Sequence, residues 1–114
     1  MSETDPCART VTWGDQSYPL NLNHRWVRNV LSFRGINGKP PAALLLAFET
    51  GAYAIEDVET ILELGLIGAG MSERDADKIL DQHVRNQPIA ENAGAAAGLL
   101  AALYVGKPND NASA

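Results

Sequence analysis

Residues 55–72 read IEDVETILELGLIGAGMS, and this stretch decides the fold class. Acidic side chains near its start lie in a first helical turn, where the positive end of the helix dipole favours them. Val58, Ile61 and Leu62 follow at helical spacing, which predicts one buried stripe. Glycines at 65, 68 and 70 then indicate either a positive φ or the close approach of another segment. The stretch therefore predicts a helix that ends in a tight glycine turn.

Two further helices are predicted before this stretch. The first runs from about residue 24 to 33, with Asn23 as its cap and Gly35 as its stop. The second starts at Pro41, whose φ suits a first helical turn, and stops near Gly51. Because this second segment is apolar on most sides, we expect it to be buried.

Two more helices are predicted after the stretch. Ser72 and Asp75 resemble a capping box that opens one of them, and Pro88 begins the last. Gly94 and Gly98 leave one face of the last helix almost without side chains. We expect another helix of the same chain to pack closely on this face, with a contact between subunits as the alternative.

The N-terminal part has the alternating pattern of two strands around residues 14–17. The apolar members of this pattern are Val11, Trp13, Tyr18, Leu20 and Leu22. The predicted fold is therefore mainly α with a short N-terminal β-hairpin, as a compact bundle of about five helices. We expect a disordered arm at residues 1–10, a single domain at 11–106 and a disordered tail at 107–114.

Composition narrows the classes of partner. The net charge is −5, and residues 54–114 hold 4 basic against 10 acidic residues, which argues against a nucleic-acid interface. The most apolar segment, residues 93–105, is shorter than the roughly 20 residues of a membrane-spanning helix. The first ten residues lack the pattern of a secretory signal, and the single cysteine, Cys7, lies in a polar start. We therefore expect a cytoplasmic protein that binds neither nucleic acid nor a membrane.

Residues that could carry chemistry are few and separated. The glycine turn lacks the lysine and hydroxyl residue of a phosphate loop, and neither His24 nor His83 has metal-ligand spacing. Asp81 and His83 are two positions apart on one helix, so their side chains point to different faces. We predict no catalytic residue, no cofactor and no metal. A small enzyme built around His83 is the alternative, and it requires these groups to converge in a pocket.

The run at residues 55–72, continued by Ile79-Leu80 and by residues 88–92 (PIAEN), resembles the small tail proteins of gene transfer agents and related siphophages. The resemblance covers about residues 11–105, and its glycine-containing centre is the most specific part. That family is described as tail tube or tail assembly chaperone proteins. Arg25–Arg28 and the Asn37–Pro41 loop depart from its pattern, in which a more acidic helix runs into a glycine-containing turn.

The resemblance implies a non-enzymatic protein of phage-type tail morphogenesis, from a phage, a prophage or a gene transfer agent. A tail tube wall consists of β-rich subunits, and two short strands offer too little material for one. We therefore favour a tail assembly chaperone that binds apolar helical segments of the tape-measure protein, with the major tail protein as a further partner. The alternative is a structural tail tube or connector subunit retained in the virion. A homo-oligomer is compatible with both.

The predicted partner-binding residues fall into two groups. The first is apolar and partly exposed on the first helix, and the second determines the shape of the glycine turn. These residues are Trp26, Val30 and Phe33, and Gly65, Gly68 and Gly70. Arg25, Arg28 and Arg34 surround the tryptophan and make this helix chemically distinct from the acidic later helices.

Overall fold

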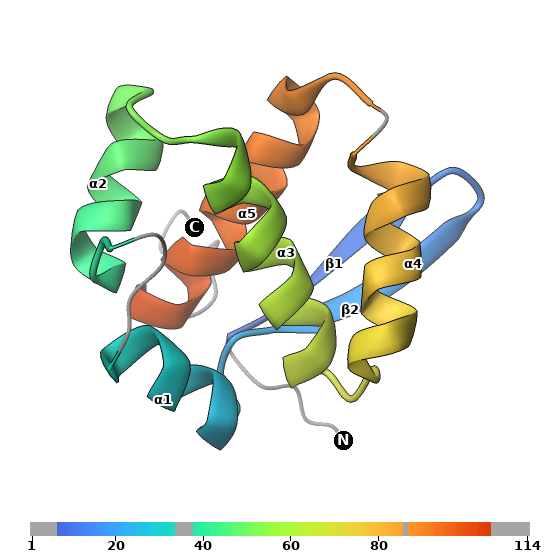
Figure 1. Ribbon diagram of the computed structural model, residues 1–114, viewed down its shortest axis with the longest axis horizontal. Helices are drawn as coiled ribbons and strands as arrows, with labels where there is room; N and C mark the ends of the chain where they lie inside the picture. Colours follow the sequence, from blue (N-terminus) through green and yellow to red (C-terminus); the bar gives the residue numbers. More distant parts are fainter. Residues whose placement is uncertain (1–6, 34–37, 86, 106–114) are drawn as a thin grey trace, which may run out of the picture.

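A β-hairpin followed by five helices makes up the described part of the protein. The computed structural model describes residues 7–33, 38–85 and 87–105. Its elements are β1 (Ala8–Trp13), β2 (Gln16–Asn21), α1 (Arg25–Phe33), α2 (Pro41–Thr50), α3 (Ile55–Gly68), α4 (Glu73–His83) and α5 (Ile89–Val105). Figure 1 shows α3 and α4 side by side on one face, with the hairpin behind them and α2 at the opposite end from the hairpin turn. The predicted mainly helical fold with an N-terminal hairpin is confirmed.

The hairpin turn is shorter than the pattern suggested. Trp13 pairs with Gln16, so only Gly14 and Asp15 lie between the antiparallel strands. Gly14 has a φ of 62°, and a positive φ at this position is required by the turns that match the twist of a two-residue hairpin.

The first strand starts earlier than expected. β1 begins at Ala8, and its ladder extends to the pair formed by Ala8 and Asn21. Cys7 is already buried. The expected disordered arm is therefore wrong for residues 8–10, because their backbone is paired with β2. Residues 1–6 and the expected tail at 107–114 lie outside the described residues.

Helix α3 lies at the centre and contacts β2, α1, α4 and α5. Its glycines allow two neighbours to approach closely. A Cβ atom on Gly65 would overlap the Leu99 side chain of α5 and lie 3.1 Å from Leu20 of β2. A Cβ atom on Gly68 would overlap the backbone oxygen of Asn21. Gly70, in contrast, has a φ of 114°. The turn therefore shows both of the features expected from its glycines, close approach of another segment and a positive φ.

The helix ends follow the local signals in most places. Pro41 is the first residue of α2, and Gly51 ends that helix with a φ of 81°. The Ser72 hydroxyl oxygen accepts the Asp75 backbone N–H at 3.1 Å, which caps α4. Gly35, the expected stop of the first helix, lies outside the described residues.

The start of α1 differs from the prediction. His24, rather than Asn23, directly precedes the helix, and its ring Nδ1 accepts the Trp26 backbone N–H at 3.2 Å. The Asn23 side-chain oxygen accepts a hydrogen bond from Arg28 at 2.7 Å. The capping role passes to His24 because the chain enters the helix one residue later than expected.

The glycine face of α5 also differs from the prediction. Gly94 and Gly98 are exposed, and a Cβ atom on either would have no other atom within 4 Å. No helix of the described chain packs on this face, so the expected intramolecular contact is wrong. The physical reason is that α3 itself supplies the glycine, Gly65, at which α3 and α5 meet.

The core lies between α3, α5 and the hairpin. Its largest fully buried side chains are mainly leucines from these elements, with contributions from α1, α2 and α4. They are Leu20, Leu22, Val27, Leu31, Leu44, Val58, Ile61, Leu62, Leu66, Leu80, Leu99 and Leu100.

Candidate partner-binding surface

Large apolar side chains remain exposed on the helices. Trp26 is 45 % exposed, Leu46 58 %, Ile55 57 % and Tyr104 46 %. They come from α1, α2, the start of α3 and the end of α5, which lie in the half of the molecule away from the hairpin turn (Figure 1). Exposed apolar groups cost free energy in water, so these side chains are candidates for contact with a partner.

Helix α2 was expected to be buried, but one of its faces is exposed. It packs against α5 through a buried face that includes Leu44 and Phe48. Ala42, Ala43 and Leu46 lie on its exposed face. The prediction of a buried helix is therefore wrong, because the helix has only one neighbour layer to pack against. Glu49 and Thr50 follow Leu46 at helical spacing, so these polar residues could have indicated which side of α2 is exposed.

Helix α1 presents the predicted apolar residues in different degrees. Trp26 is exposed, whereas Val30 is half-buried and packs against the core. Arg25 and Arg28 are exposed on the same helix. The side chain of Phe33 lies outside what the structure describes, as does Arg34.

The three glycines that were predicted to bind a partner differ in exposure. Gly65 is buried and Gly68 is half-buried, so neither offers an exposed side to a partner comparable with Trp26 or Leu46. Gly70 is exposed and borders an open hollow of about 500 Å³ that Leu66 and Met71 also line. The glycines thus bring the elements together, and their expected role in binding a partner stays a prediction.

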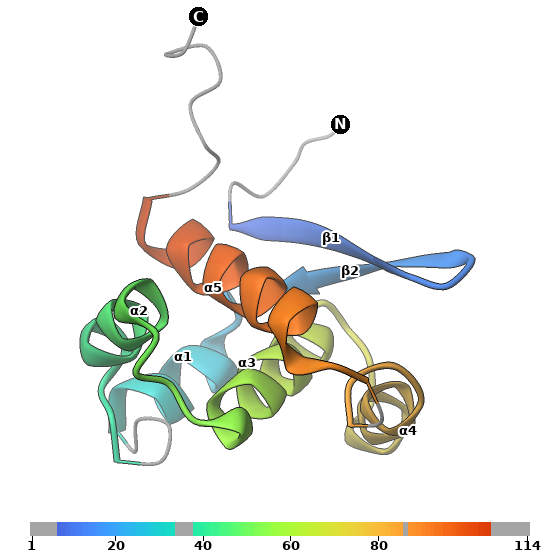
Figure 2. The same cartoon turned by 90° about the horizontal axis from the view of Figure 1, so that it is seen from above.

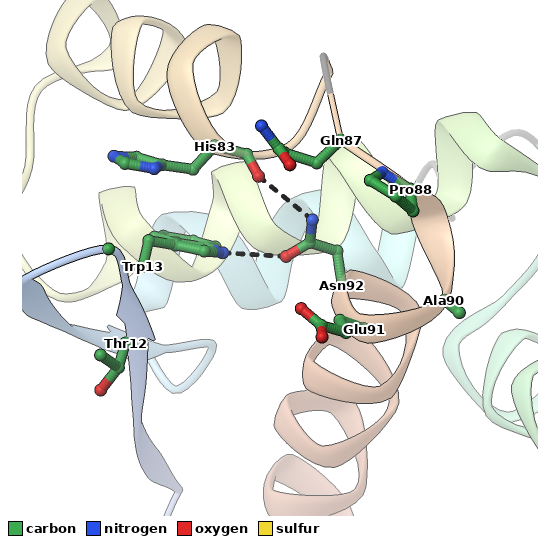
Figure 3. Close-up of a pocket in the computed structure, with 9 residues that line it drawn as sticks. Thr12, Trp13, His83, Gln87, Pro88, Ala90, Glu91 and Asn92 are labelled. Atoms are coloured by element: carbon green, nitrogen blue, oxygen red, sulfur yellow. Dashed lines mark hydrogen bonds between the residues drawn. The ribbon is translucent and has the colours of Figure 1, made fainter.

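A second hollow lies between the hairpin end, the end of α4 and the start of α5. It encloses about 530 Å³, and Figure 3 shows Trp13, His83 and Asn92 meeting in it. The Trp13 indole N–H donates to the Asn92 side-chain oxygen at 2.8 Å, and the Asn92 amide donates to the His83 carbonyl at 3.2 Å. The His83 ring stacks on Trp13 with 5.8 Å between ring centroids.

These contacts join the N-terminal hairpin to two consecutive helices near the other end of the chain. Asn92 is buried, and both ends of its amide have a partner, so its burial costs little. Sequence reasoning missed this cluster because its members lie up to 79 residues apart. The carboxylate of Asp81, which the enzyme alternative needs beside His83, instead binds Arg85 at 2.9 Å. The groups of that alternative do not converge.

An acidic face runs along α3 and α4. Arg85 bridges Asp77 and Asp81 at 2.8 and 2.9 Å. Burial raises the pKa of Glu63 above its ordinary value, while Arg85 lowers it and the carboxylates of Asp77, Glu73 and Glu59 raise it further. Glu63 is therefore a carboxylate whose charge is less favourable in the folded state than in the unfolded state.

We expect Glu63→Gln to stabilise the protein at neutral pH. A raised folded-state pKa means that the folded protein binds more protons, so the contribution of Glu63 to stability falls as pH rises above about 4.5. The gain from Glu63→Gln should vanish below that pH. Thermal melts across the pH range measure the difference. Glu49→Gln, at an exposed site on α2, controls for the lost charge, and an equal gain at acidic pH would contradict the prediction.

Among the described residues, no group of three or more His, Cys, Asp or Glu side chains could hold a metal ion. The described helices include none that is both long and apolar enough to cross a membrane.

Comparison with known proteins gives one family. A family model described as phage tail tube protein, GTA-gp10, matches residues 7–106 of the chain. The chain matches no curated protein and no solved structure.

Proposed function

Because the chain belongs to the GTA-gp10 family of phage tail proteins, its role concerns the phage tail, and we propose that it acts there as an assembly chaperone. In this role it binds apolar helical segments of the tape-measure protein in the cytoplasm and keeps them from aggregating until the tail is built. It performs no catalysis and needs no cofactor.

The observation that supports this proposal is the exposed apolar surface at the α2 end. Leu46, with Ala42 and Ala43 beside it on α2, forms an exposed helical face that a second amphipathic helix can cover. Trp26, on α1, adds a large flat side chain of the kind that dominates binding energy at interfaces.

Charge indicates which apolar segments suit this surface. Arg25 and Arg28 are exposed on either side of Trp26 in the sequence of α1. An apolar helix flanked by acidic residues would place its carboxylates near these guanidinium groups, and such pairs favour the correct orientation of a complex. A segment flanked by lysines or arginines would suffer repulsion at the same place.

The low β content supports a chaperone over a wall subunit. Within the described residues the protein has a single two-stranded sheet. A stacked tube whose wall is a continuous sheet requires more strands per subunit than this.

Co-expression with the tape-measure protein tests the proposal. We expect the wild-type protein to keep the tape-measure protein soluble and to copurify with it. Leu46→Asp should weaken that binding at least about tenfold, because it places a charge in an apolar contact. Gln82→Asp introduces the same carboxylate at an exposed site on α4 and should leave binding unchanged. A tape-measure protein that stays soluble and assembles normally without this protein would contradict the proposal.

The family description favours a second candidate, a tail tube or connector subunit that remains in the particle. Mass spectrometry of purified particles separates the two functions. A chaperone should be absent from finished particles, whereas a subunit should be present in many copies.

A further inference from the structure

The hollow between the hairpin end, α4 and α5 carries chemistry that the proposed function does not use. Its volume of about 530 Å³ is large enough for a small ligand or one large side chain. The residues around it are fixed, because the Trp13 indole N–H donates to Asn92 at 2.8 Å and the Asn92 amide donates to the His83 carbonyl at 3.2 Å. A site that is ordered in advance costs little free energy to organise when a ligand binds.

Two aromatic rings line one side of this hollow. The Trp13 and His83 rings stack with 5.8 Å between their centroids, and their planes lie within 6° of parallel. Trp13 is buried and His83 is half-buried, so the imidazole ring is the more accessible of the two. A planar guanidinium is weakly hydrated and stacks on aromatic rings more readily than a compact, strongly hydrated ammonium does. The rings therefore favour a flat cation.

The charged side chains at the hollow are acidic. Glu91 lines it, and Figure 3 shows the Glu91 carboxylate pointing to the side on which Trp13 lies. Asp15 is exposed in the adjoining hairpin turn, which Figure 2 shows beyond the end of α5. Among the described residues that line the hollow, none is a lysine or an arginine. Arg85, the nearest basic residue in the sequence, already bridges two carboxylates of α4.

An anion suits the hollow less well than a cation, although α5 begins there. The N-terminus of a helix carries about half of a positive elementary charge. Glu91, in the first turn of α5, places a full negative charge at the same end of the helix, so the local sum is negative. A carboxylate or a phosphate would be repelled by this side chain, whereas a guanidinium can pair with it through two N–H groups.

We propose that this hollow binds an arginine side chain of a partner protein. The guanidinium pairs with the Glu91 carboxylate and lies against the aromatic rings. Gln87 also lines the hollow, and its side-chain oxygen can accept a further N–H. Five N–H donors in one plane allow a guanidinium to use both acceptors together. Neither Leu46 nor Trp26 lines this hollow, so the inference stands or fails independently of the proposed function.

Titration of the isotope-labelled full chain with Nα-acetyl-arginine amide, followed by NMR at about pH 7.5, tests this inference; at that pH a free imidazole is mostly uncharged. The chain contains two tryptophans, so a Trp26→Phe variant assigns the remaining indole N–H signal to Trp13. We expect the Trp13 signal to shift with a dissociation constant of about 1–10 mM. Nα-acetyl-citrulline amide has nearly the same shape without the charge, and it should bind at least about fivefold more weakly.

A pair of matched variants tests the role of the carboxylate. Glu91→Gln removes the charge and keeps the shape, so it should weaken the binding of Nα-acetyl-arginine amide at least about fivefold. Glu56→Gln removes the same charge from the first turn of α3, at an exposed position that does not line the hollow, and should bind like the wild type. Circular dichroism verifies that both variants are folded.

The proposed arginine site fails if the Trp13 signal does not move at ligand concentrations up to about 100 mM. Equal binding of the arginine and citrulline compounds also overturns it, because the hollow would then not recognise the positive charge. So does a Glu91→Gln variant that binds as tightly as the wild type, because the carboxylate would then not be the partner of the guanidinium.

Discussion

Gly68→Ala should lower the free energy of unfolding by more than about 3 kcal/mol, which is at the upper end of what overpacking costs. The added methyl group would overlap the backbone oxygen of Asn21. A backbone atom held in a strand cannot rotate aside as a flexible side chain can. Either α3 must move away from β2 or the hairpin must bend, and both changes separate buried leucines. Urea unfolding followed by circular dichroism measures the loss.

The same substitution on α5 provides the matched control for Gly68→Ala. At Gly94 the added methyl group has no neighbour within 4 Å, so the higher helix propensity of alanine should stabilise the protein by up to about 1 kcal/mol. Equal effects at Gly68 and Gly94 would show that close approach to β2 is not what requires the glycine.

Asp57→Ala should destabilise the protein by about 2–4 kcal/mol, between the cost of a lost helix cap and that of a broken buried ion pair. The Asp57 carboxylate is fully buried at the start of α3. It accepts the Ala54 backbone N–H at 2.8 Å, and Lys39 lies 3.3 Å from the same oxygen. Its removal leaves a half-buried N–H without this partner and releases the loop before α2 from α3.

Two further variants divide the effect of Asp57 into its parts. Asp57→Asn keeps an oxygen that can accept the Ala54 N–H but removes the charge. Lys39→Met removes only the ammonium group, which is partly exposed, so it should cost less than about 1 kcal/mol. Chemical denaturation of the single variants and the double variant gives the coupling energy. A Lys39→Met variant as unstable as Asp57→Ala would mean that the ion pair, rather than the helix cap, dominates.

Local chemistry explains why much of the fold could be predicted from the sequence. The start of α2 at Pro41, its end at Gly51 and the cap at Ser72 each depend on residues within a few positions of one another. The central glycine turn was predicted for the same reason, because clustered glycines indicate a positive φ or the close approach of another segment, whatever residues surround them. Errors at the hairpin and at α1 amount to a few residues at element boundaries.

The candidate site could be predicted only in part. Trp26 was expected to be exposed and is, whereas Leu46 was missed because α2 is apolar on most sides. Which side of such a helix meets solvent depends on where α5 lies, and no local signal gives that position. The contact of Trp13 with Asn92 was missed for a similar reason, since hydrogen bonds between distant residues leave no spacing to detect.

The sequence by itself determined the elements of this protein, because helix ends, turns and strands depend on short-range chemistry. Its resemblance to small phage tail proteins rested mainly on a local run, residues 55–72, and was expected to cover about residues 11–105; the family match covers residues 7–106. Tertiary structure alone decided what the glycines do. Gly65 and Gly68 are filled by neighbours, whereas Gly94 and Gly98 face open space. Only the packing of one element against another distinguishes these pairs, because all four are helical glycines with similar local sequence signals.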